Sequence, residues 1–261
     1  MIPKIIHYCW FGGNPLPELA IKCIDSWRIF CPDYEIKEWN ESNFDINIID
    51  YVKEAYDAKK YAFVADYARF FVLYQYGGIY FDTDIEVIRN IDDILDNKCF
   101  FGFGPRNLTL PVFGSEAHQP FYEDVLLDYS NRHFIKEDGS YDLTTIERMA
   151  QRLLIVKYGL ILNGKAQLLE TGIYIYPKEY FFSTDYLTGI TTLNEDLYVI
   201  HHCDGSWLDD ESKLCLQYQR KAIKYLGRSI GSNVGFFLYF IKTKGVSYTI
   251  KKAIKKICKL S

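Results

Sequence analysis

Nine residues decide the fold of this chain: Tyr76-Gly77-Gly78-Ile79-Tyr80-Phe81-Asp82-Thr83-Asp84. The glycine pair marks a turn, and the three β-forming residues after it predict a short buried strand. Asp82 and Asp84 follow at the strand end, where residues two apart point to the same side of an extended chain. Two neighbouring carboxylates repel each other unless a cation lies between them, so the pair predicts a Mg²⁺ or Mn²⁺ site with open positions for substrate phosphates. A solvated turn is the alternative interpretation.

Length and composition indicate a globular protein. The chain has 261 residues, enough for one large α/β domain with an appendage, and is 49% hydrophobic and 25% charged. Its seven cysteines are scattered without zinc-type spacing, which favours reduced thiols in a cytosol. Lys4 and His7 interrupt the apolar N-terminus, so it does not resemble a signal peptide. No run of about twenty apolar residues predicts a membrane-spanning helix.

Charge divides the chain into two regions. Residues 213–261 hold 12 of the 30 basic residues and no acidic one, which leaves 18 basic against 34 acidic residues in 1–212. This asymmetry predicts that the C-terminal end meets an anionic surface. We therefore expect a catalytic domain over 1–212 and a basic helical extension over 213–261.

The extension has two apolar segments. From Ile250 onward apolar residues recur at helical spacing between lysines, and Val234 to Ile241 is mostly apolar. Both are too short to span a bilayer, but they fit insertion at its interface. In the alternative interpretation, 213–241 completes the fold and the last lysines form a solvated helix face. The acidic body argues against a nucleic-acid arm.

The N-terminal third predicts a nucleotide-binding unit. A strand over 3–10, a Gly/Pro loop over 11–17, a helix over 17–30 and a strand over 34–39 follow one another, which is typical of βαβ folds. The segment lacks Gly-X-Gly-X-X-Gly and a Walker sequence, so neither a dinucleotide site nor a P-loop is supported.

A mostly helical segment over 55–76 places Asp66 and Arg69 on one face. A surface ion pair is one interpretation, but their apolar neighbours and the glycine turn that follows favour a functional pair. The remaining pattern predicts further strands at 85–88, 99–103, 174–177 and 197–200, a loop or strand at 111–115, and helices at 120–129 and 144–158. The last strand leads to His201-His202 and Ser206-Trp207.

Four motifs occur in a specific order: His7-Tyr8-Cys9-Trp10-Phe11-Gly12-Gly13, Asp66-X-X-Arg69, Gly77-Gly78-X-Tyr80-X-Asp82-X-Asp84 and His202-X-X-X-Ser206-Trp207. Together they resemble the DXD-containing glycosyltransferases of family 32, which include bacterial capsular-polysaccharide sugar transferases and yeast mannosyltransferases. More distantly, the chain is similar to the glucosyltransferase domain of large clostridial toxins. The resemblance covers roughly residues 1–210.

The resemblance implies an α/β fold of the GT-A type, in which a Rossmann-like nucleotide-binding half and an acceptor-binding half share one mixed central sheet. It implies a metal-dependent, retaining sugar transfer from a nucleotide-diphosphate donor, with a UDP-sugar favoured, to a glycan or lipid-linked acceptor in surface polysaccharide synthesis. With the basic tail, it places the enzyme as a peripheral protein on the cytoplasmic face of the cell membrane.

The same resemblance assigns roles to individual residues. Trp10 is expected to stack on the nucleotide base, although core packing is an alternative for this side chain. The other expected site residues are Asp66 and Arg69 at the donor sugar and ribose–phosphate, Tyr80 lining the nucleotide pocket, Asp82 at ribose and sugar hydroxyls and in the metal shell, Asp84 as the direct metal ligand, and Ser206 and Trp207 closing over the diphosphate. His202 is a further candidate metal ligand, with the choice between His201 and His202 left open.

Other functions remain as alternatives. A GDP-mannose-dependent mannosyltransferase and a non-catalytic nucleotide-sugar or glycan-binding protein would share these motifs. A glycoside hydrolase is disfavoured because its two carboxylates must flank the scissile bond. A nucleotidyltransferase would release pyrophosphate instead of a nucleoside diphosphate.

Overall fold

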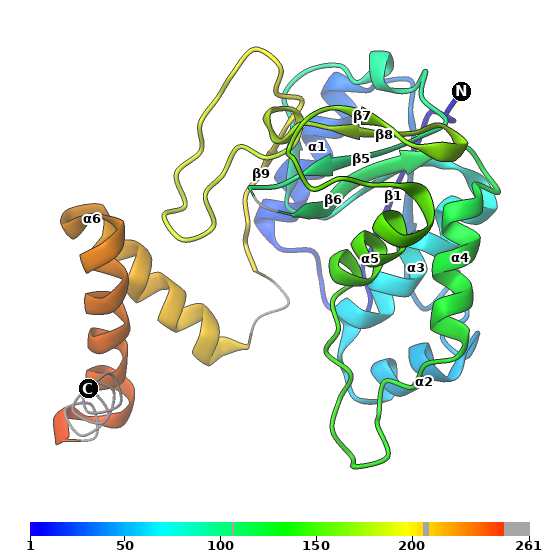
Figure 1. The fold of residues 1–261 in the computed structure, drawn as a ribbon. Coiled ribbons are helices and arrows are strands. Elements are labelled where there is room, and N and C mark those ends of the chain that lie inside the picture. Colours follow the sequence, from blue (N-terminus) through cyan, green and yellow to red (C-terminus); the bar gives the residue numbers. More distant parts are fainter. Residues whose placement is uncertain (106, 206–208, 248–261) are drawn as a thin grey trace. The chain divides into compact units, whose positions relative to one another are not determined.

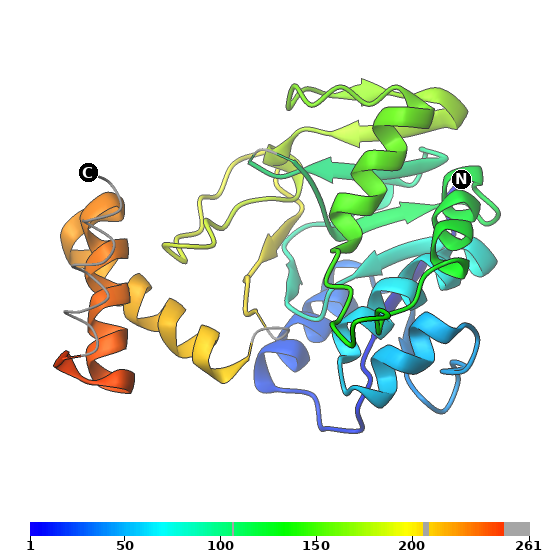
Figure 2. The same ribbon diagram turned by 60° about the horizontal axis from the view of Figure 1, so that its bottom comes forward.

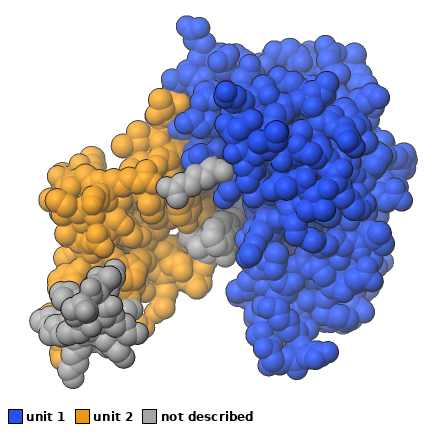
Figure 3. Space-filling model, in the orientation of Figure 1, with its two compact units in different colours: residues 1–183, 193–202 blue, residues 184–192, 203–261 orange. Residues whose placement is uncertain are grey.

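The computed structural model describes residues 1–105, 107–205 and 209–247. The chain divides into two compact units (Figure 3): one of Met1–Ser183 with Leu193–His202, the other of Thr184–Thr192 with the chain from Cys203 onward. The domain boundary expected between 212 and 213 falls within the C-terminal helix and stays a prediction.

The first unit is built on a mixed seven-stranded sheet (Figures 1 and 2). Its strands, in spatial order, are β2 (Glu35–Trp39), β1 (Ile5–Cys9), β3 (Gly78–Phe81), β6 (Leu108–Ser115), β5 (Cys99–Phe103), β8 (Ile173–Tyr176) and β7 (Gln167–Leu168). β1 runs parallel to both β2 and β3, whereas β6 is antiparallel to its two neighbours. The expected α/β class with a mixed central sheet is confirmed.

Five α-helices accompany this sheet: α1 (Glu18–Phe30), α2 (Asp50–Asp57), α3 (Tyr61–Tyr76), α4 (Pro120–Ser130) and α5 (Ile146–Tyr158). Short 3₁₀ helices cover Asp92–Ile94, Glu170–Gly172 and Lys178–Tyr180. The stretch over 55–76 is mostly helical as expected, formed by the end of α2 and the whole of α3 with a break at residues 58–60. Lys59 between them has a φ of 56°, a left-handed conformation that a continuous right-handed helix cannot contain.

The central strands of the sheet are buried on both faces, and β3 shows how. Ile79 and Phe81 belong to one core cluster with Trp27 of α1, while Tyr80 points into the other cluster with residues of α2, α3, α4 and α5. Successive strand residues point to opposite faces, so an unbroken apolar strand needs cover on both sides. In Figure 1, α3, α4 and α5 gather on one side of the sheet.

The turn into β3 is held by a buried imidazole. The Trp39 indole Nε1 donates to His7 Nδ1 at 2.9 Å, so the proton lies on Nε2, which donates to the Gly77 carbonyl at 2.8 Å. Burial lowers the pKa of His7 to about 4, so the ring is neutral. Gly77 has a φ of 64°, and a Cβ at Gly78 would meet the Ile5 carbonyl oxygen at 2.6 Å, so both positions require glycine.

In the second unit, α6 (Asp210–Lys244) forms a helical hairpin. Its helix breaks at Gly227, where φ is 71° and ψ is 168°. The two arms touch backbone to backbone, since a Cβ on Gly231 would meet Ile223 Cα at 2.4 Å and one on Gly235 would meet Gln219 Cα at 2.4 Å. The expected C-terminal helix is therefore present. No helix in the described part of the chain is long and apolar enough to cross a membrane.

Candidate functional site

The aspartate pair lies in a tight turn directly after β3. The Ile85 amide donates to the Asp82 carbonyl at 3.1 Å, which closes the turn before β4 (Ile85–Val87). The sequence had suggested that the two carboxylates converge because they alternate along an extended strand. In the structure this turn brings them together instead. Both residues are half-buried.

A histidine from the last segment of the first unit lies beside the two aspartates. β9 (Val199–His201) runs antiparallel to β4 and places His201 opposite Ile85. His201 Nε2 lies 3.4 Å from an Asp84 carboxylate oxygen. One ligand atom each from Asp82, Asp84 and His201 lies within 4.8 Å of the others. Two carboxylates and an imidazole fit a divalent cation, and oxygen-rich donor sets suit Mn²⁺.

His202 lies elsewhere. Its Nε2 is 2.7 Å from Glu86 Oε2, a carboxylate that also pairs with Lys22 at 2.7 Å. The structure thus brings His201 to the aspartates and directs the His202 ring to a different carboxylate. The metal-ligand role expected of His202 has no support from this arrangement.

Arg69 connects the helix motif to the strand motif. Its guanidinium lies 3.2 Å from Asp66 Oδ1 and 3.2 Å from Asp82 Oδ1. It also stacks over the Tyr80 ring, with Cζ 4.6 Å from the ring centroid. Arg69 is only 7% exposed, so the alternative of a surface ion pair between Asp66 and Arg69 is excluded. Tyr80 is fully buried beneath Arg69, where it supports the guanidinium.

The surroundings of the site disfavour the charged form of two of its carboxyl groups. Burial raises the pKa of Asp66 to about 7 and that of Asp82 to about 6, and Arg69 only partly opposes this effect. The Asp84 carboxylate raises the pKa of Asp82 further. A divalent cation between Asp82 and Asp84 would relieve this repulsion.

The charge of Glu147 is felt at two half-buried aspartates of the site. It lies in the first turn of α5, and its charge contributes to the raised pKa values of Asp66 and Asp82, after the larger effect of burial. An acidic residue in a first helical turn is usually a response to the helix dipole, so sequence alone gave no reason to single it out.

Trp10 follows β1 directly, and β1 lies beside β3 in the sheet. Its indole is partly buried against the core, and Nε1 donates to the Asn14 carbonyl at 2.6 Å. The stacking role of Trp10 stays a prediction. Ser206 and Trp207 lie outside the described residues.

Comparison with known proteins points to one family. Residues 17–101 match the family described as a glycosyltransferase sugar-binding region containing a DXD motif. Inositol phosphoceramide mannosyltransferase 3 of Schizosaccharomyces pombe is 35% identical over 130 residues, 48% of this chain and 36% of that protein. Inositol phosphoceramide mannosyltransferase 2 of the same yeast is 27% identical over 250 residues, 92% of this chain and 66% of that protein.

Among solved structures, the PaToxG glycosyltransferase matches 59% of this chain and 69% of its own, with 17% identity and a TM-score of 0.46. The chain spans between about a third and two thirds of the length of the first curated relatives that it matches. The matched segment contains the α3 pair and the aspartate turn. This similarity links the aspartate turn of the chain to glycosyltransferases whose sugar-binding region contains a DXD motif.

Proposed function

We propose that this protein transfers a sugar from a nucleotide-diphosphate donor to a hydroxyl of a glycan or lipid-linked acceptor, with retention at the anomeric carbon. The observation that carries the proposal is the convergence of Asp82, Asp84 and His201 on one point beside the buried Arg69. The match of residues 17–101 to a glycosyltransferase region with a DXD motif supports a nucleotide sugar and a divalent metal at this place.

Asp84, Asp82 and His201 are the residues that would hold the metal ion, and their donor atoms fit Mn²⁺. When bound, such an ion neutralises the charge of the leaving diphosphate.

The chain's own residues bind and orient the donor. Arg69 is held in place by Asp66, Asp82 and the face of Tyr80, and it also donates to the Ala65 and Leu110 carbonyls. We propose that this fixed positive charge stabilises a sugar or phosphate oxygen of the donor. Asp66 and Asp82 offer carboxylate oxygens to sugar and ribose hydroxyls. Trp10 is proposed to stack on the base. Ser206 and Trp207 are proposed to cover the diphosphate.

The donor is the first question to test. The curated relatives are named mannosyltransferases, which favours mannose and hence GDP-mannose; the sequence motifs alone favoured a UDP-sugar. The purified protein is incubated with Mn²⁺ and, in separate reactions, GDP-mannose, UDP-glucose, UDP-galactose and UDP-N-acetylglucosamine. Release of the nucleoside diphosphate, abolished by chelator, is expected for one donor.

Each rival function gives a different result in this assay. Pyrophosphate release would indicate a nucleotidyltransferase, and cleavage of a glycoside without any nucleotide would indicate a hydrolase. Tight donor binding without nucleoside diphosphate release, with or without a glycan acceptor, would indicate a non-catalytic binding protein. Any of these outcomes overturns the proposal.

We further propose that the enzyme works in surface polysaccharide synthesis, as a peripheral protein on the cytoplasmic face of the membrane. The helix α6 supports this location. Its basic residues have no acidic counterpart after residue 212, and several large apolar side chains are exposed on it: Leu226, Ile230, Phe236, Phe237 and Leu238. Basic residues near an anionic leaflet contribute roughly 1 kcal/mol each.

Liposome sedimentation tests this location. The full chain is compared with a version that ends at Gly245, using vesicles with and without anionic lipid. Membrane binding should require anionic lipid and weaken with salt. If the truncated chain no longer binds, the tail after Gly245 carries the binding. If the truncated chain still binds, α6 carries it. If the full chain stays in the supernatant with anionic vesicles at low salt, the membrane proposal is wrong.

A further inference from the structure

A pocket with a volume of about 500 Å³ lies in the first unit. Its walls come from the end of α4, the loop before α5 and one face of α5. The lining residues are Asp128, Arg132, Asp142, Thr144, Arg148, Met149, Gln151, Arg152, Ile155 and Val156. Neither the family motifs nor the proposed donor site uses any of them.

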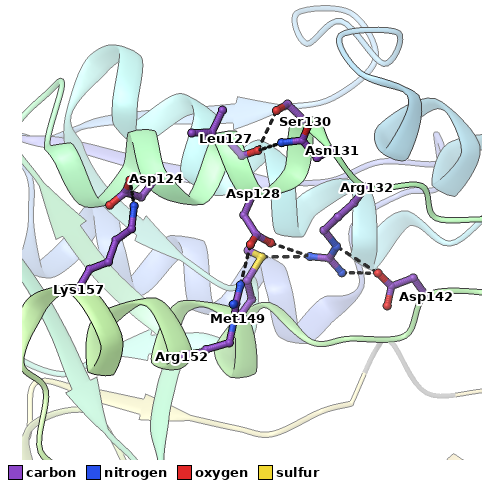
Figure 4. A network of polar contacts seen from close by, with 10 residues as sticks. All are labelled: Asp124, Leu127, Asp128, Ser130, Asn131, Arg132, Asp142, Met149, Arg152 and Lys157. Atoms are coloured by element: carbon purple, nitrogen blue, oxygen red, sulfur yellow. Dashed lines mark hydrogen bonds and ion pairs between the residues drawn. The ribbon is translucent and has the colours of Figure 1, made fainter.

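Three guanidinium groups and two carboxylates set the charge of this pocket. Figure 4 shows that Arg132 is held by Asp142 at 2.6 Å and by the Met149 sulfur at 3.0 Å, and that Arg152 pairs with Asp128 at 2.7 Å. Among the described residues, Arg148 has no hydrogen-bond or ion-pair partner. The pocket therefore carries a net positive charge within a region of the chain, 1–212, that has 34 acidic and 18 basic residues.

The pocket also has an apolar lip. Val156 is 76% exposed and Ile155 42% exposed on the outer turn of α5. A basic wall beside an exposed apolar edge fits a ligand with an anionic group and a less polar continuation. Arginine is well suited to phosphate, because its planar fork donates two parallel hydrogen bonds to two oxygens.

Two buried tyrosines connect the pocket to the donor site. The Arg132 guanidinium lies 5.1 Å from the ring centroid of Tyr51 and 4.9 Å from that of Tyr129. The two rings meet edge to face, with centroids 4.9 Å apart, and neither hydroxyl has a hydrogen-bond partner among the described residues. The Tyr129 ring also contacts the ring of Tyr67 on α3, with centroids 5.5 Å apart, and Tyr67 directly follows Asp66 in the chain.

Helix α5 also links the pocket to the donor site. Arg148, in the first turn of this helix, lines the pocket. One turn later, Gln151 accepts from the Leu108 amide of β6, the strand whose Leu110 carbonyl accepts from Arg69. The pocket and the donor site thus lie on neighbouring parts of α5 and β6.

We propose that this pocket is an acceptor subsite, in which Arg148 and Arg152 bind a phosphate group carried by the acceptor glycan or lipid headgroup. The inference rests on the proposed function and names the acceptor class of that site. Arg132 is a positioning residue that shapes the basic wall through Asp142 and Met149.

Ligand-observed NMR titrations test the subsite without any donor. The probes are myo-inositol 1-phosphate and uncharged myo-inositol. The variant Arg148→Gln removes a guanidinium that has no hydrogen-bond or ion-pair partner among the described residues. Lys157→Gln is the control, because it removes one positive charge from α5 outside the pocket, together with the ion pair to Asp124. Arg148→Gln should weaken phosphate binding about tenfold or more, since hydrogen bonds to charged groups are the strong ones, and Lys157→Gln should leave it unchanged.

The proposal is overturned if the wild type binds both probes equally or neither. It is also overturned if Arg148→Gln binds like the wild type, or if both variants lose the same affinity, which would indicate a general charge effect. Donor binding, followed separately with GDP-mannose and the UDP-sugars, should be equal in all three proteins. If no donor binds while Arg148-dependent phosphate binding persists, the proposed function fails and the anion site stands.

Discussion

We predict that substitution of His201 weakens the binding of Mn²⁺ to the metal site. His201→Ala removes one of the three donor groups that converge within 4.8 Å. His202→Ala is the matched control, because the neighbouring ring lies 2.7 Å from Glu86. Loss of even an outer-shell partner costs 10–100-fold in metal affinity, so loss of a direct ligand should cost at least about that much.

This loss has a measurable effect on thermal stability. At a Mn²⁺ concentration of about 100 times the wild-type Kd, binding stabilises the folded state by about 2.7 kcal/mol. With tenfold to 100-fold weaker binding, the same concentration provides only about 1.4 to 0.4 kcal/mol. A chain of this size changes its Tm by about 2–4 °C per kcal/mol. The Mn²⁺-induced rise in Tm should therefore be about 3–9 °C smaller in His201→Ala.

Two assays measure the effect. Thermal unfolding with and without Mn²⁺ gives the shift for each protein relative to its own metal-free state, which removes any direct effect of the substitution on folding. Electron paramagnetic resonance of free Mn²⁺ gives the Kd directly. His202→Ala should match the wild type in both. If His202→Ala loses Mn²⁺ affinity and His201→Ala keeps it, the reading of this site is wrong.

Four further predictions concern other parts of the molecule. Asp84→Asn should lower sugar transfer by orders of magnitude with little change in Tm, because it removes a ligand charge but little volume; full activity of the folded variant would contradict the metal site. Trp10→Ala should weaken binding of the nucleoside diphosphate by about 1–3 kcal/mol in a calorimetric titration; a large loss of stability with unchanged affinity would show core packing instead. His7 has a folded pKa of about 4 against an unfolded value near 6.5. The unfolded chain therefore binds more protons between these values, and stability should fall by about 3 kcal/mol as pH drops from about 7 to 4; His7→Asn should lose that part of the slope in urea unfolding. Gly235→Ala should destabilise the α6 hairpin by about 1–3 kcal/mol in a denaturant titration, because the added Cβ meets the Gln219 backbone at 2.4 Å; an unchanged midpoint would refute the close contact.

The sequence predicted the parts of the molecule that depend on local patterns. The strand over Ile79–Phe81 was readable because its β-forming residues follow a glycine turn, and α1 was readable from its helical period. Asp66 and Arg69 could be paired from their spacing on one helix. The aspartate pair also follows from chain order, although the turn closed between Asp82 and Ile85, and not an extended strand, brings the carboxylates together.

Tertiary structure decided the parts that depend on distant pairing. The sequence offered two adjacent histidines, and only the antiparallel register of β9 against β4 brings the ring of His201 to Asp84. The break between α2 and α3 depends on the left-handed backbone conformation of Lys59, which no residue type in this segment predicted. The arginines of the α5 pocket lie far from the motifs in sequence. This pocket lies on a part of the fold next to the donor site because α5 packs against β6, and a contact between distant segments leaves no periodic signal in either one.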